Sequence, residues 1–235
     1  MSDKIQRLYE SFVSTGYRDI DTVLGGGFSP SSLNLIAAPT GMGTSTLMAN
    51  IAIRATKATA KPVLFVSLES PAELLNRRIH RIAGTVTAFP VLVQDDLQSV
   101  RAIADFIEGY GLLGDLALVL IDNLALLVDS TDEAAKALKR LAISKSVPVL
   151  LSAKIHSRHR DGKHQKRPIY QSDFQDFGIL PEVADSVIAL YREEYYTGEP
   201  SSQSEAIIVK NRHGSTALVS LRHNLESGRF EGIGE

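Results

Sequence analysis

Cysteine is absent from this chain, and no apolar run in it is long enough to cross a membrane. Without cysteine the chain has neither disulfides nor thiolate metal sites, which is usual in the reducing cytoplasm where we expect it to act. The polar, charged first residues are unlike a signal peptide. The formal net charge is only −2, so any surface that binds nucleic acid must be local. What remains is a globular chain of 235 residues, long enough for one α/β domain with a large core.

Near-continuous apolar runs alternate with helical segments along the chain, at residues 33–38, 63–68, 116–121 and 147–152. Such runs are typical of parallel strands that helices cover on both faces. The alternation predicts an α/β fold with a mainly parallel, twisted sheet and helices on both faces. Apolar residues on both sides of the turn residues 211–215 predict a C-terminal β-hairpin.

The two ends of the domain are less clearly defined by the sequence. Residues 1–14 have an apolar edge and predict a short N-terminal helix or arm, followed by one domain over 15–235. Whether the arm packs on its own domain or on a neighbouring subunit stays open. Residues 88–93 fit either a strand or a loop, and the polar residues 193–204 predict a loop.

Residues 33–53 predict a strand, a glycine turn and a helix, which is the frame of a phosphate-binding P-loop. The glycines let successive N–H groups point at an anion, and the helix adds the positive end of its dipole. In the usual pattern G-x-x-x-x-G-K-[ST], Ala38 and Gly43 stand at the glycines and Ser45 provides the hydroxyl for magnesium. Thr44 takes the place of the lysine, so the cradle loses its formal charge. The residues expected to bind the nucleotide are Pro39, Thr40, Gly41, Met42, Gly43, Thr44, Ser45 and Thr46.

Two of the apolar runs are followed by a carboxylate, Glu69 and Asp122. Ligands of parallel sheets bind beyond the carboxyl ends of the strands, so both acids are expected near the P-loop. Asp122 fits the Walker B pattern and would hold magnesium together with Ser45. Glu69 has two open interpretations, a catalytic acid or the cap of the following helix. The arginines of that helix are interpreted as a solvated face: Arg77, Arg78 and Arg81.

Residues 154–168 are strongly basic and almost free of apolar side chains, so we expect a mobile loop that does not enter the core. The loop would leave the sheet at the same edge as the P-loop. This favours contact with the phosphates of a nucleic acid over a merely solvated surface. The cations expected to bind DNA are Lys154, Arg158, Arg160, Lys163, Lys166 and Arg167.

A series of stretches resembles, in order, the RecA-like ATPase domain of the hexameric replicative helicase DnaB. They are residues 15–21 (TGYRDID), 30–51, 65–70 (FVSLES), 120–124 (LIDNL), 147–152, 173–185, 191–194 (YREE) and 207–214 (IIVKNRHG). The resemblance implies a RecA-like P-loop NTPase core with ATP and Mg²⁺ as cofactors. It also implies a hexameric ring with ATP sites between subunits, single-stranded DNA held by central loops, and replication partners such as a primase and a loader.

The resemblance also assigns roles to three residues. Glu69 matches the base that activates water, and Lys210 and Arg212 match a pair that reaches the γ-phosphate in the neighbouring subunit. We expect Arg212 to be exposed at a hairpin tip, where its charge stabilises nothing within its own subunit.

Two positions depart from the family pattern, and they leave two functions open. Thr44 replaces the P-loop lysine, and Ala153 stands where a glutamine usually follows the serine of the fourth strand. The first function is a DnaB-like helicase ATPase that couples ATP binding and hydrolysis to translocation along single-stranded DNA, impaired by Thr44. The second is a non-hydrolysing RecA-like module that binds nucleotide or DNA and acts by assembly with a replication partner. A recombinase or clock-type ATPase is a weaker third alternative, because residues 65–70 and 173–185 resemble the helicases.

Overall fold

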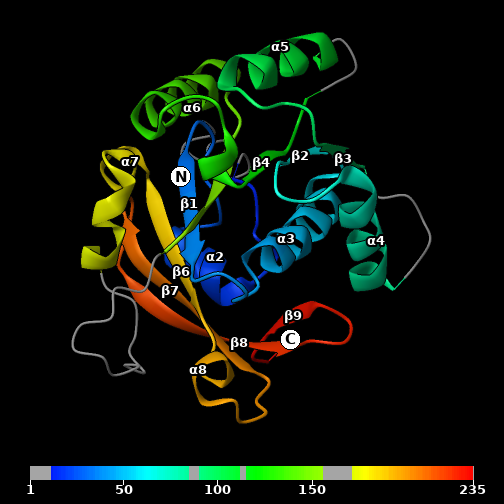
Figure 1. Ribbon diagram of the computed structural model, residues 1–235, viewed down its shortest axis with the longest axis vertical. Coiled ribbons are helices and arrows are strands. Elements are labelled where there is room, and N and C mark those ends of the chain that lie inside the picture. Colours follow the sequence, from blue (N-terminus) through cyan, green and yellow to red (C-terminus); the bar gives the residue numbers. More distant parts are fainter. Residues whose placement is uncertain (1–11, 85–89, 112–114, 156–170, 235) are drawn as a thin grey trace, which may run out of the picture.

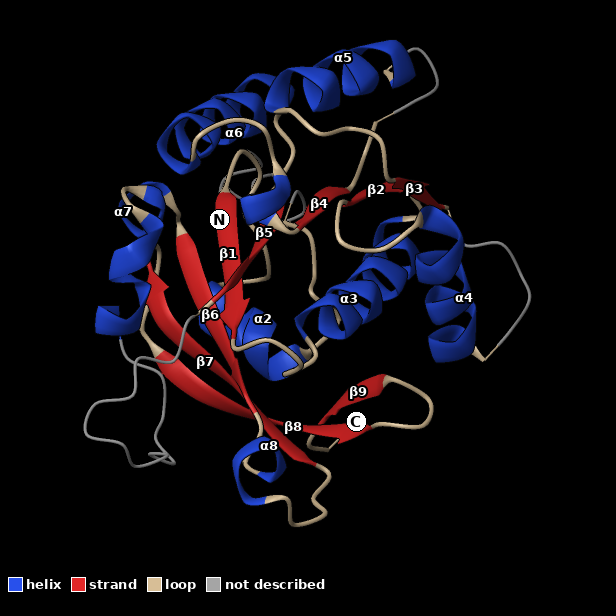
Figure 2. Ribbon diagram, viewed as in Figure 1, coloured by secondary structure: helices blue, strands red, loops and turns tan. Residues whose placement is uncertain are grey.

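The computed structural model describes residues 12–84, 90–111, 115–155 and 171–234. Within these ranges the strands form a nine-stranded sheet in the order β3-β2-β4-β5-β1-β6-β7-β8-β9 (Figure 2). The strands are β1 (Leu33–Ala38), β2 (Val63–Ser67), β3 (Val91–Gln94), β4 (Leu118–Asp122), β5 (Val149–Lys154), β6 (Ser186–Tyr191), β7 (Gln203–Asn211), β8 (Ala217–Asn224) and β9 (Arg229–Gly232).

Strands β1 to β6 pair in parallel, and β7, β8 and β9 extend the sheet in antiparallel pairs. The four apolar runs of the sequence are β1, β2, β4 and β5, so the prediction that they share one mainly parallel sheet is confirmed. The predicted hairpin consists of β7 and β8. Strand β1, which leads into the P-loop, lies between β5 and β6 and is buried throughout.

Helices cover both faces of this sheet (Figure 1). They are α2 (Arg18–Leu24), α3 (Thr44–Thr59), α4 (Ala72–Ala83), α5 (Val100–Tyr110), α6 (Thr131–Lys145), α7 (Leu180–Val183) and α8 (Glu194–Thr197), with the 3₁₀ helices η1 (Leu124–Leu126) and η2 (Gln171–Phe177). Helices α3 and α4 pack on one face, and α5, α6 and α7 pack on the other. Among the described residues, no helix combines the length and apolarity needed to span a bilayer.

Side chains along each strand alternate between the two faces, as extended backbone requires. Phe65 of β2, Leu120 of β4 and Leu150 of β5 all pack on the α3 side. Asp122 lies two residues after Leu120 in β4, and Lys154 lies four residues after Leu150 in β5. Both side chains therefore point to the α3 side as well. The functional groups at the strand ends therefore lie on the same face as the P-loop helix.

Three segments outside the central strands have predictions of their own: residues 1–14, 88–93 and 193–204. Residues 1–11 lie outside the described residues, so the N-terminal arm and its division from the domain stay a prediction. Of the open segment 88–93, residues 91–93 belong to the edge strand β3, and residues 88–89 lie outside the described residues. The predicted loop 193–204 contains one helical turn, α8, closed by Gly198 in the left-handed conformation.

Asp185 joins three elements at the edge of the sheet where β1 begins. Its carboxylate accepts a hydrogen bond from the Leu33 N–H (2.8 Å) and from the Lys139 ammonium of α6 (2.6 Å). Arg212 Nε lies 3.5 Å from the other carboxylate oxygen. The Asp185 side chain is 6% exposed and that of Lys139 is 24% exposed, so removing one partner leaves the other poorly solvated.

Replacing Asp185 by alanine is expected to lower the free energy of unfolding by about 2–3 kcal/mol, because the Leu33 N–H loses its acceptor and Lys139 loses its counter-charge and keeps only the Ser31 carbonyl. The melting temperature should fall by roughly 5–10 °C, measured by circular dichroism. Asp105→Ala removes an exposed acid of α5 and should cost less than about 0.5 kcal/mol. Equal losses for the two variants would show that the buried pair does not hold this edge.

Candidate functional site

The segment between β1 and α3 adopts the turn that its glycines predict. Gly41 and Gly43 have φ angles of +83° and +104°, which residues with a Cβ adopt only under strain. Helix α3 begins directly after Gly43, and no side chain caps its N-terminus. Its first N–H groups and the positive end of its dipole are therefore available to an anion at the carboxyl edge of the sheet.

A cavity of about 270 Å³ lies at this edge. It is lined by residues 38–41 and 43–46, by Glu69, by Asp122 and Asn123, by residues 152–154 and by Arg78. Of the predicted nucleotide-binding residues only Met42 is missing from this lining, because its side chain is buried in the core. The Met42 carbonyl instead accepts a hydrogen bond of 3.1 Å from Arg192.

The two predicted acids line this cavity from neighbouring strands. Asp122 is 5% exposed, and a hydrogen bond of 2.5 Å from Ser152 Oγ orients its carboxylate. Glu69 does not cap α4, since the helix begins at Ala72 and the Ala72 N–H donates to the Asp95 carboxylate. The capping interpretation of Glu69 is therefore wrong, and the acid is placed where a catalytic role is geometrically open.

Two cations line the cavity although Thr44 brings none. Lys154 Nζ lies 2.6 Å from Glu69 Oε1, and both side chains are more than one third exposed. The sequence groups Lys154 with the DNA-binding loop, whereas the structure places it at the end of β5 beside Ala38 of β1. The sequence offered one signal for this position. Lys154 follows Ser152 by two residues, and side chains two apart in a strand point to the same face. Arg78 of α4 also contributes to the lining, so it is more than part of a solvated face.

The residues at this edge fit a nucleotide phosphate and Mg²⁺. The uncapped start of α3 offers N–H groups to phosphate oxygens. The Ser45 hydroxyl and the Asp122 carboxylate line the same cavity, and oxygen donors of this kind suit Mg²⁺ together with phosphate oxygens. The chemistry open to the site is phosphate binding and, through Glu69, the orientation of water.

Lys210 and Arg212 lie at the opposite end of the sheet. Lys210 Nζ donates to the carbonyls of Pro181 and Glu182 (2.7 and 2.9 Å). Arg212 Nη2 donates to the Glu182 carbonyl (3.0 Å), and its Nε lies 3.5 Å from Asp185. The expectation that Arg212 stabilises nothing within its own subunit is therefore wrong, because a backbone carbonyl of α7 and a buried carboxylate attract it.

Both cations lie far from the P-loop of their own chain. Burial, and next the charge of Arg212, lowers the pKa of Lys210. Arg212 remains 49% exposed. The length of β1, roughly 20 Å at the usual rise per residue, separates this end of the sheet from the P-loop of the same chain.

The other predicted DNA-binding cations lie outside the described residues, so their role stays a prediction: Arg158, Arg160, Lys163, Lys166 and Arg167. The last described residue before them is the buried Ile155, whose N–H donates to the Ala38 carbonyl (3.0 Å). The described chain after β5 therefore ends beside the P-loop.

A buried ionic cluster supports the P-loop from the β6 side, and sequence reasoning did not assign it. Arg192 donates to the Met42 carbonyl and contacts Glu194, which also lies 3.1 Å from His223 Nε2. Burial raises the pKa of Glu194, but the bonds from Arg192 and His223 outweigh it, so the net shift is downward. The YREE stretch thus helps to fix the loop backbone.

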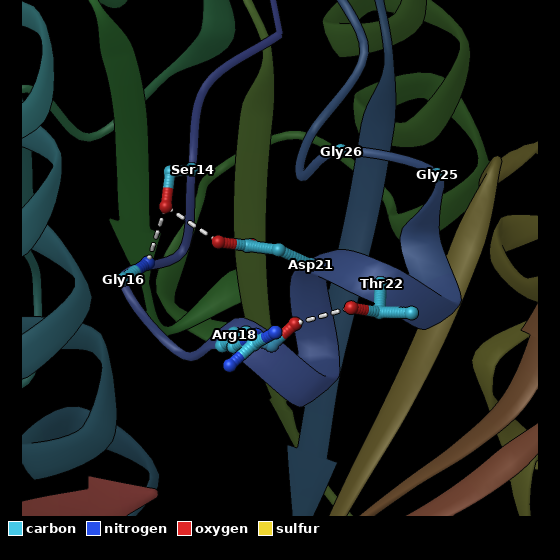
Figure 3. Close-up of a pocket in the computed structure, with 7 residues that line it drawn as sticks. All are labelled: Ser14, Gly16, Arg18, Asp21, Thr22, Gly25 and Gly26. Atoms are coloured by element: carbon cyan, nitrogen blue, oxygen red, sulfur yellow. Dashed lines mark hydrogen bonds between the residues drawn. The ribbon is translucent and has the colours of Figure 1, made fainter. Parts of the chain in front are cut away.

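A second hollow lies beside α2 (Figure 3), lined by Ser14, Gly16, Arg18, Asp21, Thr22, Gly25 and Gly26. Asp21 accepts hydrogen bonds from Ser14 Oγ and from the N–H and hydroxyl groups of Thr15. Burial raises the pKa of Asp21. These bonds hold the turn that leads to β1, so the TGYRDID stretch contributes structure to the fold.

Comparison with known proteins shows which family the chain resembles. The family model for the DnaB-like helicase C terminal domain matches residues 12–90 and 76–232. The replicative DNA helicase DnaB of Haemophilus influenzae is 29% identical over 265 residues, which cover 95% of this chain and 56% of that protein. The replicative DNA helicase DnaC of Bacillus subtilis is 27% identical over 271 residues, covering 97% and 59%. The chain therefore spans a little over half the length of these relatives.

Solved structures extend the likeness to the fold. One of them, described as an ATPase domain, has a TM-score of 0.83 at 25% identity, with 94% of this chain and 90% of that chain covered. A DnaB-like replicative helicase, described with its interactions with primase, also reaches 0.83 at 24% identity, covering 98% and 68%. The RadB recombinase shares the fold at a TM-score of 0.63 and 19% identity, covering 94% and 99%. The core is thus a RecA-like P-loop ATPase fold, and the chain belongs to the DnaB-like helicase C-terminal domain family.

Proposed function

We propose that this chain is the ATPase domain of a DnaB-like replicative helicase, which binds ATP and Mg²⁺ and couples binding and hydrolysis to movement along single-stranded DNA. Thr44 impairs the hydrolytic step. The observation that carries the proposal is the cavity in which the uncapped start of α3 meets Glu69 and Asp122. Membership of the DnaB-like family supports it.

Each residue has a distinct role in this proposal. The N–H groups of Gly41 and of residues 43–46 bind phosphate oxygens, and Ser45 and Asp122 hold Mg²⁺. The metal neutralises charge on the β- and γ-phosphates. Glu69 orients the attacking water. Lys210 and Arg212 complete the site of a neighbouring subunit, which makes a hexameric ring part of the proposal. Replication partners such as a primase and a loader also belong to it.

The alternative is a non-hydrolysing module that binds nucleotide or DNA and acts by assembly with a replication partner. Two observations favour it: Thr44 brings no charge, and Lys154 pairs with the acid that should orient water. Both observations bear on hydrolysis more than on binding, because the N–H groups and the dipole of α3 remain available to phosphate.

The test is phosphate release by the unaltered chain with and without single-stranded DNA, beside Glu69→Gln. DNA-stimulated turnover, even slow, that disappears in Glu69→Gln supports the helicase ATPase. Binding of ATP with no turnover in either protein supports the non-hydrolysing module. A chain that does not bind ATP refutes the helicase ATPase, and a chain that binds neither ATP nor single-stranded DNA refutes both.

Replacing Arg158, Arg160, Lys163 and Arg167 together by alanine is expected to weaken binding of single-stranded DNA. Because each phosphate contact adds roughly 0.7 to the slope of log K against log salt, the slope should fall by up to roughly 3. Fluorescence anisotropy over a salt series measures it. The matched control replaces four cations elsewhere, Lys61, Arg77, Arg101 and Lys145. An unchanged slope in the loop variant would mean that these cations do not contact DNA phosphates and that the loop is only a solvated surface.

A further inference from the structure

We infer that Lys154 replaces the missing P-loop lysine: its ammonium binds the phosphates of the nucleotide from the β5 side of the cavity. The inference rests on the proposed function, because it assumes that the cavity holds a nucleotide. It assigns Lys154 to the nucleotide site and away from the DNA-binding loop.

The position of Lys154 is the first argument. In the parallel register Lys154 pairs with Ala38, the last residue of β1 before the P-loop. Neighbouring strands lie about 5 Å apart, so the flexible lysine stem starts one strand away from the loop. The alternation of β5 turns it to the α3 face, and it lines the cavity together with Thr44 and Ser45.

Charge is the second argument. Glu69 and Asp122 line this cavity, and a nucleotide adds further negative charge beside them. Lys154 Nζ lies 2.6 Å from Glu69 Oε1. The side chains of this ion pair are 37% and 38% exposed. A pair this exposed is weak and exchanges readily. A phosphate carries more charge than a carboxylate, and it can therefore draw Lys154 across the cavity.

Lys154 is a better candidate than the other cation of the lining. Arg78 reaches the cavity from α4, which packs against α3 and β3 and forms no part of the strand edge. Lys154 is fixed at its base by strand pairing on the element next to β1. Because Lys154 lies beside Glu69, the acid proposed to orient water, we expect Lys154 to support binding of the nucleotide more than its hydrolysis.

The experiment measures binding of ATP with Mg²⁺ by isothermal titration calorimetry in a double-mutant cycle. The four proteins are the unaltered chain, Lys154→Met, Thr44→Lys and the double variant. Removing Lys154 should weaken binding about tenfold or more when residue 44 is threonine, and less than about threefold when it is lysine. Lys154→Arg keeps the charge and should stay within about threefold of the unaltered chain. Lys61→Met, which removes a lysine at the far end of β2, should change nothing, and thermal melts confirm folding of each variant.

Other results overturn the inference. Equal weakening in both backgrounds would mean that Lys154 acts independently of residue 44, and no weakening would mean that it does not bind phosphate. Loss of affinity in Arg78→Gln but not in Lys154→Met would transfer the role to Arg78. If the unaltered chain binds ATP and Lys154→Met binds it equally well, the inference fails while the proposed function stands. If only proteins with Lys at position 44 bind ATP, the inference fails together with the proposed binding of ATP by the unaltered chain. If none binds, both fail.

Discussion

Thr44→Lys should raise the DNA-stimulated ATPase by about two or more powers of ten. Residue 44 is the first residue of α3, and its side chain lines the cavity. The threonine hydroxyl is neutral and short, whereas a lysine would place a full charge beside the β- and γ-phosphates. Negative charge must be neutralised as the phosphoryl group transfers, so hydrolysis should gain more than binding.

Steady-state phosphate release with saturating single-stranded DNA measures this gain. Thr44→Met has nearly the length of lysine without its charge, so it should gain little and isolates the electrostatic effect. Rapid turnover by the unaltered chain would show that another cation already supports hydrolysis. No gain in Thr44→Lys chains that form rings would favour the non-hydrolysing module.

Arg212→Ala, made in the Thr44→Lys background, is expected to lower the ATPase by about 10³. The guanidinium is half exposed, and roughly 20 Å of β1 separates its edge of the sheet from its own P-loop. In the proposed ring its charge acts on a nucleotide held by another subunit. Within its own chain the variant loses an exposed hydrogen bond to the Glu182 carbonyl and a 3.5 Å contact with Asp185, which keeps Lys139 as a partner. The loss of stability should be about 1 kcal/mol.

Mixing experiments distinguish action between subunits from action within one. Rings assembled from Arg212→Ala and Arg212-containing chains should lose activity out of proportion to the fraction of altered chains. Arg222→Ala removes an exposed arginine of β8 in the same hairpin and should leave mixed rings active. A loss strictly proportional to the altered fraction would mean that each subunit works alone.

Local pattern was enough to predict most of the fold. The buried strands β1, β2, β4 and β5 are the continuous apolar runs of the sequence. The glycine turn and the acids at two strand ends gave the P-loop edge, since parallel strands bring their carboxyl ends together.

The parts that sequence reasoning missed depend on which elements become neighbours. Lys154 enters the cavity because β5 pairs with β1, and no local pattern states that order. Arg78 enters it because α4 packs beside α3. Arg212 is partly neutralised because α7 and Asp185 lie against the end of β7. Each of these is a tertiary contact between segments far apart in the chain.

The central claim is that the P-loop cavity binds a nucleotide although its lysine is replaced. Amide hydrogen exchange of the unaltered chain, with and without saturating ATP and Mg²⁺, tests this most directly. We predict slower exchange in residues 41–46, while residues 14–26 around the second hollow stay unchanged. Unchanged exchange at 41–46 in a folded protein, or protection confined to 14–26, would contradict the claim.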